Sequence, residues 1–176
     1  MTPVFVPSVW NLKIPPRVHI FLWLLSKNKL LTRDNLAKRQ NLDTETCLFC
    51  NEHETSQHLF FECVVAGTIW DLISQALGTD LRSFTAVASK WLSNKKFAAI
   101  NIVSSAVLWS LRKLRNDICF QNTAWRDLRL LLWKVVKLMQ NWQILCPPLL
   151  LEDLQSYITI IREMARSPAR LMNGTS

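Results

Sequence analysis

The chain has 176 residues, of which 49% are hydrophobic and only three are glycine. This length allows one domain or two small ones, and such a composition favours packed helices over strands joined by tight turns. The net charge is +8, yet residues 41–80 contain seven acidic residues and no lysine or arginine. A phosphate-binding finger is normally basic itself, so any contact with nucleic acid is expected from the basic flanks.

Two helices are expected near the N-terminus. Pro15 and Pro16 mark the start of a helix over about residues 16–26, because proline is tolerated in the first helical turn. Its apolar face repeats at helical spacing and consists of Val18, Phe21, Leu22 and Leu25. Thr32 then has the side chain of an N-cap, and Asp34 follows in the first turn, where the helix dipole favours a carboxylate.

Four residues in the acidic segment have the spacing of a metal site, C-x2-C-x7-H-x4-C: Cys47, Cys50, His58 and Cys63. Three thiolates and one imidazole form a complete tetrahedral set for one structural Zn²⁺, which leaves no coordination position for a catalytic water. The pattern predicts a hairpin knuckle at the cysteine pair and a short helix, about residues 57–62, that carries the histidine. A short cysteine pair can also be a redox pair or a disulfide, and spacing alone leaves that alternative open.

The other histidines and cysteines are expected to have no role at this site. His53 follows Cys50 after only two residues, so its use as a ligand would force a cramped loop, and we expect an exposed histidine. His19 lies among apolar residues and is expected to be buried and hydrogen-bonded. Cys119 and Cys146 are expected to be small buried hydrophobic residues. Cysteine usage without a disulfide framework favours an intracellular protein, nuclear or cytoplasmic.

The rest of the chain is predicted to be helical. Helices are expected at about residues 65–77, 96–120 and 150–165, with a further short helix near 83–92. The apolar run from Phe97 to Leu111 is shorter than the roughly 20 residues that a bilayer span needs, so a buried core helix without membrane contact is expected. A heptad seam is formed by Trp125, Leu128, Leu132, Val135, Met139 and Trp142.

These expectations define the fold class as mainly α, with a Cys3His zinc knuckle in a first helical domain and a helical array after it. The predicted divisions are a zinc-binding domain over residues 9–78, a helical region over residues 83–166 and a disordered tail over residues 167–176. Core packing is expected for four tryptophans that lie beside apolar faces: Trp10, Trp23, Trp70 and Trp109. The seven acidic residues around the metal segment are expected to be solvated.

An ordered series of blocks resembles the zinc-binding domain that follows the reverse transcriptase in plant LINE-type (non-LTR) retroelements. The blocks are Trp10, IPPRVHIFLWLL, LLTRDNLAKR, CLFC, ETSQHLFFEC and Trp70, with a weaker similarity at LWSLRKLRNDICFQ. The resemblance implies zinc binding by the four residues of the cysteine–histidine pattern, an origin in retrotransposition and a nucleic-acid role. It does not imply polymerase activity, because the chain has no Tyr/Phe-x-Asp-Asp pair and no spaced set of acids for two-metal chemistry.

The function expected from these features is a structural, non-catalytic zinc module that contacts RNA or DNA. The candidate phosphate contacts are Arg112, Lys113 and Arg115, although a solvated helix face would have the same composition. Two alternatives stay open: a protein-interaction module that docks a partner helix on the heptad seam, and a non-functional remnant of a mobile element. No enzyme and no small-molecule substrate are expected, because no set of nucleophile, base and oxyanion donors can be assembled from the motifs.

Overall fold

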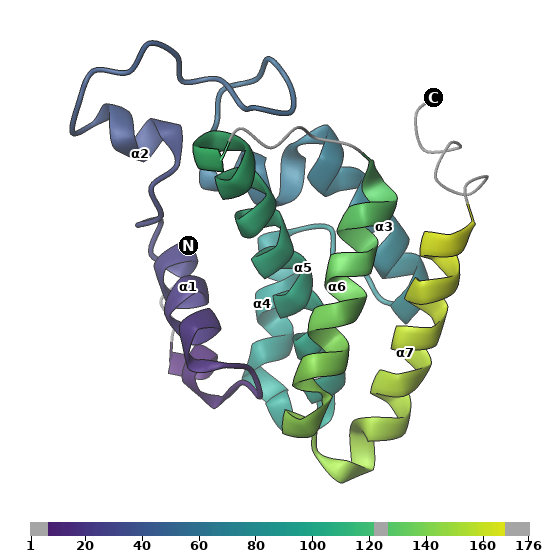
Figure 1. The fold of residues 1–176 in the computed structure, drawn as a ribbon. Coiled ribbons are helices and arrows are strands. Elements are labelled where there is room, and N and C mark those ends of the chain that lie inside the picture. Colours follow the sequence, from purple (N-terminus) through teal and green to yellow (C-terminus); the bar gives the residue numbers. More distant parts are fainter. Residues whose placement is uncertain (1–6, 122–126, 168–176) are drawn as a thin grey trace.

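A computed structural model describes residues 7–121 and 127–167 of the chain (Figure 1). Within these ranges the regular elements are helices, and a single β-bridge between Thr46 and His53 is the one exception. The predicted mainly α class is therefore confirmed. The α-helices are α1 (Pro16–Ser26), α2 (Arg33–Ala37), α3 (Val64–Leu77), α4 (Phe84–Ser89), α5 (Asn94–Gln121), α6 (Leu128–Trp142) and α7 (Pro148–Arg166). Short helical turns are η2 (Pro7–Asn11), η3 (His58–Glu62), η4 (Lys90–Ser93) and η5 (Gln143–Leu145).

Helix α5 is the centre of the fold, with α1 on one side of it and α6 and α7 on the other (Figure 1). The continuous helical stretch Phe84–Gln121 is long and apolar enough to cross a membrane by length and composition alone. In the folded chain, however, 72% of its most apolar window is buried among the other helices. The apolar run is thus part of a core helix, as the shortness of the run predicted.

The heptad seam lies on α6 and packs inside this chain. Leu132, Val135, Met139 and Trp142 are all buried, and α6 packs against both α5 and α7. Trp125, the first residue of the predicted seam, lies outside the described residues. Because the described part of the seam is already covered by the chain's own helices, it offers no free face to a partner helix.

One core extends across the stretch that was predicted to separate two regions. Helix α3 ends at Gly78, whose φ of +65° is the left-handed conformation that glycine adopts at helix C-termini. Helix α4 then begins at Phe84, and its N-cap is Ser83, whose hydroxyl accepts a hydrogen bond from the Ala86 N–H. Buried side chains on both sides of residues 78–83, among them Trp70 and Trp91, belong to a single hydrophobic cluster. The predicted tail lies almost entirely outside the described residues.

Three of the four tryptophans pack as expected. Trp70 is fully buried, stacks on Phe61 at 5.5 Å between ring centroids, and donates its indole N–H to the Phe60 carbonyl at 2.7 Å. Trp23 and Trp109 are half-buried against the core. The expectation for Trp10 is wrong, because its side chain is 51% exposed. The residue before it, Val9, points into the core, and on a tight 3₁₀ turn the next side chain faces outward.

The expected hydrogen bond of His19 is present. Its Nε2 atom lies 2.9 Å from the Leu12 carbonyl, and its ring lies 6.0 Å from that of Trp10. The side chain is half-buried rather than buried. This contact ties the start of α1 to the turn that precedes it.

Replacing Trp70 by phenylalanine should destabilise the protein by about 1–3 kcal/mol, because it removes the buried indole donor to the Phe60 carbonyl. The measurement is the free energy of unfolding from urea titration of the zinc-loaded protein. The matched control, Trp10→Phe, changes an exposed ring and should stay within about 0.5 kcal/mol of the wild type. Equal effects of the two substitutions would contradict the assigned packing.

Candidate metal centre

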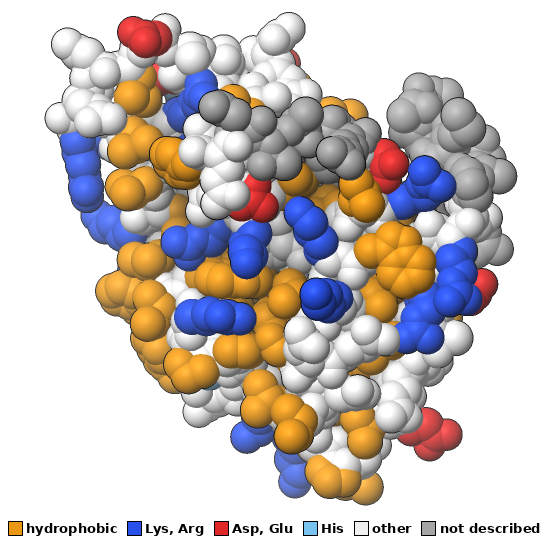
Figure 2. Space-filling view, in the orientation of Figure 1, with side chains coloured by type: hydrophobic (Ala, Val, Ile, Leu, Met, Phe, Trp, Pro, Cys, Tyr) orange, Lys and Arg blue, Asp and Glu red, His pale blue; other side chains and the backbone are white. Residues whose placement is uncertain are grey.

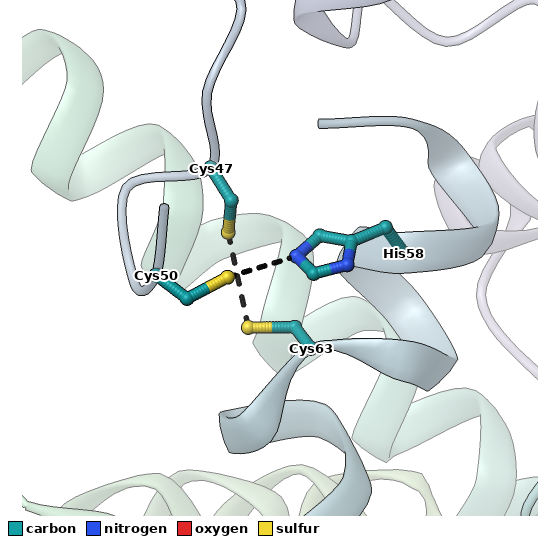
Figure 3. Close-up of side chains that lie close together, drawn as sticks. All are labelled: Cys47, Cys50, His58 and Cys63. Atoms are coloured by element: carbon teal, nitrogen blue, oxygen red, sulfur yellow. Dashed lines mark hydrogen bonds between the residues drawn. The ribbon is translucent and has the colours of Figure 1, made fainter. Parts of the chain in front are cut away.

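The structure brings together the four side chains of the predicted metal site (Figure 3). Cys47 and Cys50 lie on the loop that precedes η3, while His58 and Cys63 lie at its two ends. Their four ligand atoms lie within 4.8 Å of one another. The Sγ atoms of Cys47 and Cys63 are 3.8 Å apart, and the Sγ atom of Cys50 lies 3.2 Å from His58 Nε2.

These distances fit a zinc ion better than a disulfide. A disulfide requires sulfur atoms about 2.05 Å apart, whereas all five cysteines of the chain are free thiols. In a tetrahedral site with Zn–S bonds of about 2.3 Å, neighbouring sulfur atoms lie about 3.8 Å apart. The Cys47–Cys63 separation therefore matches one edge of a zinc tetrahedron, and the four residues present fit the metal that their chemistry favours.

The loop around the cysteine pair is the predicted hairpin knuckle. The Cys47 N–H donates to the Glu52 carbonyl at 2.7 Å, and the Glu54 N–H donates to the Glu45 carbonyl at 2.9 Å. Inside the turn, the Phe49 N–H points at the Cys47 sulfur at 3.5 Å. An amide dipole aimed at sulfur favours the thiolate, which is the form that binds metal.

The segment that carries His58 is a π-helical turn, whereas the sequence predicted an ordinary short helix. The Cys63 N–H donates to the His58 carbonyl at 2.7 Å, five residues back. In an α-helix, with 3.6 residues per turn, side chains five residues apart point about 140° away from each other. The wider π turn brings His58 and Cys63 round to the same side, so that both reach one point.

The sulfur atoms of Cys47 and Cys63, 3.8 Å apart, are too close to ionise together without a cation. The hydrogen bond with Cys63, together with burial, raises the pKa of the Cys47 thiol, while the same hydrogen bond lowers the pKa of Cys63. A divalent metal between the sulfur atoms supplies the positive charge that stabilises all of them as thiolates. Zinc binding therefore releases protons, and the affinity falls as the pH falls.

A buried ion pair connects the metal loop to the central helix. The Glu54 side chain is 0% exposed and that of Arg115 is 7% exposed, with Arg115 Nη2 lying 2.8 Å from Glu54 Oε1. A second contact, from Arg115 Nε to Glu54 Oε2, measures 3.4 Å. Glu54 Oε1 also accepts the Arg33 N–H at 2.9 Å, so one carboxylate holds α5 and the start of α2 to the loop.

This pair corrects two expectations. Glu54 is not solvated, and Arg115 is not a free cation for phosphate, because both side chains are buried against each other. The helical spacing did contain a signal, since Arg115 lies four residues after Leu111 and three before Ile118 on the apolar face of α5. A lone arginine on such a face requires a buried carboxylate.

The other two candidate cations differ from each other. Lys113 is exposed. Arg112 is half-buried, with its guanidinium 4.9 Å from the ring centroid of Phe21 and 5.4 Å from that of Trp109. Burial lowers the pKa of Arg112, yet an arginine stays protonated at neutral pH.

The remaining histidine and acidic residues of the loop lie at the surface. His53 is 55% exposed and faces Glu45 at 3.6 Å, outside the group of four ligands. The other acidic residues of residues 41–80 are exposed as expected, namely Asp43, Glu45, Glu52, Glu62, Asp71 and Asp80. Of the two remaining cysteines, Cys146 is buried and Cys119 is half-buried.

Taken together, the helical fold and the closed Cys3His group define a protein with one structural zinc site. Residues 3–70 match the family model described as zinc-binding in reverse transcriptase. This part of the chain is therefore a zinc-binding domain of the reverse-transcriptase-associated type. Searches of curated proteins and of solved structures gave no match.

Zinc removal should unfold the predicted zinc-binding domain, residues 9–78. Apparent binding energies at structural zinc sites are about 10–16 kcal/mol, comparable with the whole stability of a typical domain, about 5–15 kcal/mol. Native mass spectrometry should find one Zn²⁺ per chain, and Cys47→Ser or Cys63→Ser should abolish it. Chelation should lower the helical circular dichroism and expose the first half to protease. His53→Ala is the control that should keep the metal, and unchanged proteolysis after chelation would contradict the assignment.

The buried ion pair generates a second prediction. Arg115→Met should cost about 3–5 kcal/mol of unfolding free energy, because it leaves the Glu54 carboxylate buried without its cation. Adding Glu54→Gln should restore part of this loss, since the amide oxygen still accepts the Arg33 N–H without a charge. Arg129→Met, which removes an exposed pair with Asp127, is the control and should cost at most about 1 kcal/mol. A double variant no more stable than Arg115→Met in urea titration would refute the role of the charge.

Proposed function

We propose that this protein is a non-catalytic, zinc-stabilised module that associates with RNA or DNA, and that it derives from a LINE-type retroelement. The zinc domain supports the first part, because a metal with four protein ligands has no open position for a reacting water. The order of sequence blocks supports the retroelement origin. Free thiols and a thiolate-rich zinc site favour a reducing compartment, nuclear or cytoplasmic.

The observation that carries the nucleic-acid proposal is the arrangement of free cations around α1, α2 and α5. Four exposed basic residues follow the ends of these two helices: Lys27 and Lys29 after α1, and Lys38 and Arg39 after α2. Lys113 on α5 is also exposed. Figure 2 shows lysine and arginine side chains gathered across this face of the molecule, with hydrophobic side chains between them. Such a mixture suits a ligand with both negative charge and aromatic faces.

The aromatic part of this surface is Trp109, which two arginines flank. The Arg17 guanidinium lies 5.7 Å from the centroid of the Trp109 ring, and that of Arg112 lies 5.4 Å from it. Stacking on a ring holds a guanidinium in place while its outer N–H groups stay free to donate. Arg112 is therefore a preordered cation, and Lys113 is an exposed one beside it.

Binding of a fluorescein-labelled single strand should weaken steeply with salt. If about five cations each contact a phosphate, the affinity should fall about 100-fold between about 50 and 200 mM salt. Fluorescence anisotropy of the zinc-loaded protein measures this directly. Lys113→Ala should lower the affinity and reduce the slope of log K against log salt by about 0.7.

Lys95→Ala is the matched control, because it removes one exposed charge at the opposite end of the same helix. It should leave the affinity within about twofold of the wild type, since its distance from the cluster exceeds the Debye length of about 10 Å. Equal losses of affinity for Lys113→Ala and Lys95→Ala would indicate that the protein attracts the strand through its net charge alone. Absence of binding at low salt would refute the proposed function.

A further inference from the structure

A hollow of 400 Å³ lies between α2 and the C-terminal part of α5, and we name it the α2–α5 groove. Its floor is made by side chains of the hydrophobic core, namely Leu30, Leu59 and Phe60. Leu24 of α1 and Leu36 of α2 line it as well. The volume lies within the range of about 300–1,000 Å³ found for ligand sites, and seven of the thirteen lining residues are apolar.

Two large hydrophobic side chains at this groove are strongly exposed. Phe120, in the last turn of α5, is 74% exposed, and Leu31 is 52% exposed. Both line the hollow, and the Asn116 side chain lies one helical turn before Phe120. An exposed phenylalanine beside an apolar hollow offers a flat surface on which a planar, partly apolar group can stack.

The charged groups of the groove are all cationic. Lys29 and Arg112 line it, and so does Arg115, whose charge is already neutralised by Glu54. A second hollow adjoins it, sharing Lys29 and Leu31 and lined also by Lys27, Lys38 and Arg39. No acidic residue is among the described residues that line either hollow. The combined surface is therefore complementary to a ligand that carries several negative charges.

We propose that the α2–α5 groove binds single-stranded nucleic acid, with one unpaired base stacked on Phe120 and adjacent phosphates on Lys29, Lys38 and Arg112. This inference rests on the proposed function and adds the site and the strandedness. An unpaired base exposes the aromatic face that Phe120 and the apolar floor accept, whereas a duplex keeps those faces stacked inside. The cations on both sides of the hollow can contact the phosphates of a nucleic-acid backbone that runs across it.

The groove also depends on the metal loop. Glu54 accepts the Arg33 N–H at the start of α2 and binds Arg115 of α5, so the same carboxylate fixes both walls. Binding experiments therefore use the zinc-loaded protein. The same contacts mean that variants at Glu54 or Arg115 would change the fold as well as the groove, and we leave these residues unchanged in the test.

The test compares strands with and without bases. The probes are fluorescein-labelled strands of about 12 nucleotides, within the site sizes of about 4–16 nucleotides known for single-strand binders: uridine RNA, thymidine DNA and a DNA strand of abasic sites. The wild type should bind the uridine or thymidine strand more tightly than the abasic strand. Phe120→Ala should weaken binding of the base-containing strand about 5- to 100-fold and leave abasic binding unchanged.

Two matched controls separate stacking from general surface effects. Ile144→Ala removes a hydrophobic side chain that is more exposed than Phe120, at 87%, in the turn between α6 and α7, and should not change any affinity. Lys29→Ala and Lys38→Ala should weaken binding of base-containing and abasic strands alike, because they contact phosphate. Circular dichroism of Phe120→Ala should match that of the wild type, since its side chain projects into solvent.

The outcomes distinguish this proposal from the one on which it rests. Equal binding of base-containing and abasic strands, with no effect of Phe120→Ala, would overturn the groove while leaving a phosphate-binding function intact. A duplex of the same length bound as tightly as the single strand would overturn it too, as would displacement of the strand by polyglutamate at equal charge concentration. If neither the uridine nor the thymidine strand binds at low salt, both proposals fall.

Discussion

The structure depends on holding an irregular loop at a defined place between helices. Between the end of α2 and the start of η3 the chain forms no helix longer than a turn, and its knuckle is stabilised by only a few backbone hydrogen bonds. Four ligand atoms converging within 4.8 Å provide a fixed point for this loop. Ordering so many residues without regular hydrogen bonding costs conformational entropy. In small domains the free energy of metal binding is large enough to offset a cost of this kind.

The Glu54–Arg115 pair extends that constraint beyond the metal. Two residues that are 61 positions apart in the sequence meet in the core, and their charges are buried together. Each charge alone in this environment would be costly, so the pair selects arrangements in which loop and central helix are in register. The same carboxylate also fixes the start of α2, because it accepts the first N–H of that helix. Metal, loop and two helices therefore form one connected unit.

Most of the fold and the metal ligands could be predicted because their signals are local. Apolar spacing located the helices, the pair Pro15–Pro16 located the start of α1, and the cysteine–histidine spacing located all four residues that the structure brings together. These signals arise within one or two turns of chain. The seam on α6 was also visible, although its packing between α5 and α7 required the tertiary structure.

Two of the misses arise from a contact between distant segments, and two arise from the geometry of local turns. Arg115 was expected to bind phosphate because its neighbours Arg112 and Lys113 are basic, and its position on the apolar face was overlooked. Glu54 was expected in solvent because it is one of seven acidic residues scattered around the metal segment. Trp10 was expected in the core, but it lies on a 3₁₀ turn in which its neighbour Val9 takes the buried position. A π turn at η3 has no sequence signature in residue type.

That π turn links the evolution of the metal site to that of the core. The residues between His58 and Cys63 include Leu59, Phe60 and Phe61, all of them buried. Lengthening or shortening this spacer by one residue would rotate one ligand out of the tetrahedron and move the aromatic rings out of their contacts at the same time. Selection to keep the protein folded therefore also preserves the ligand spacing, even in a lineage where the bound ion has only a structural role.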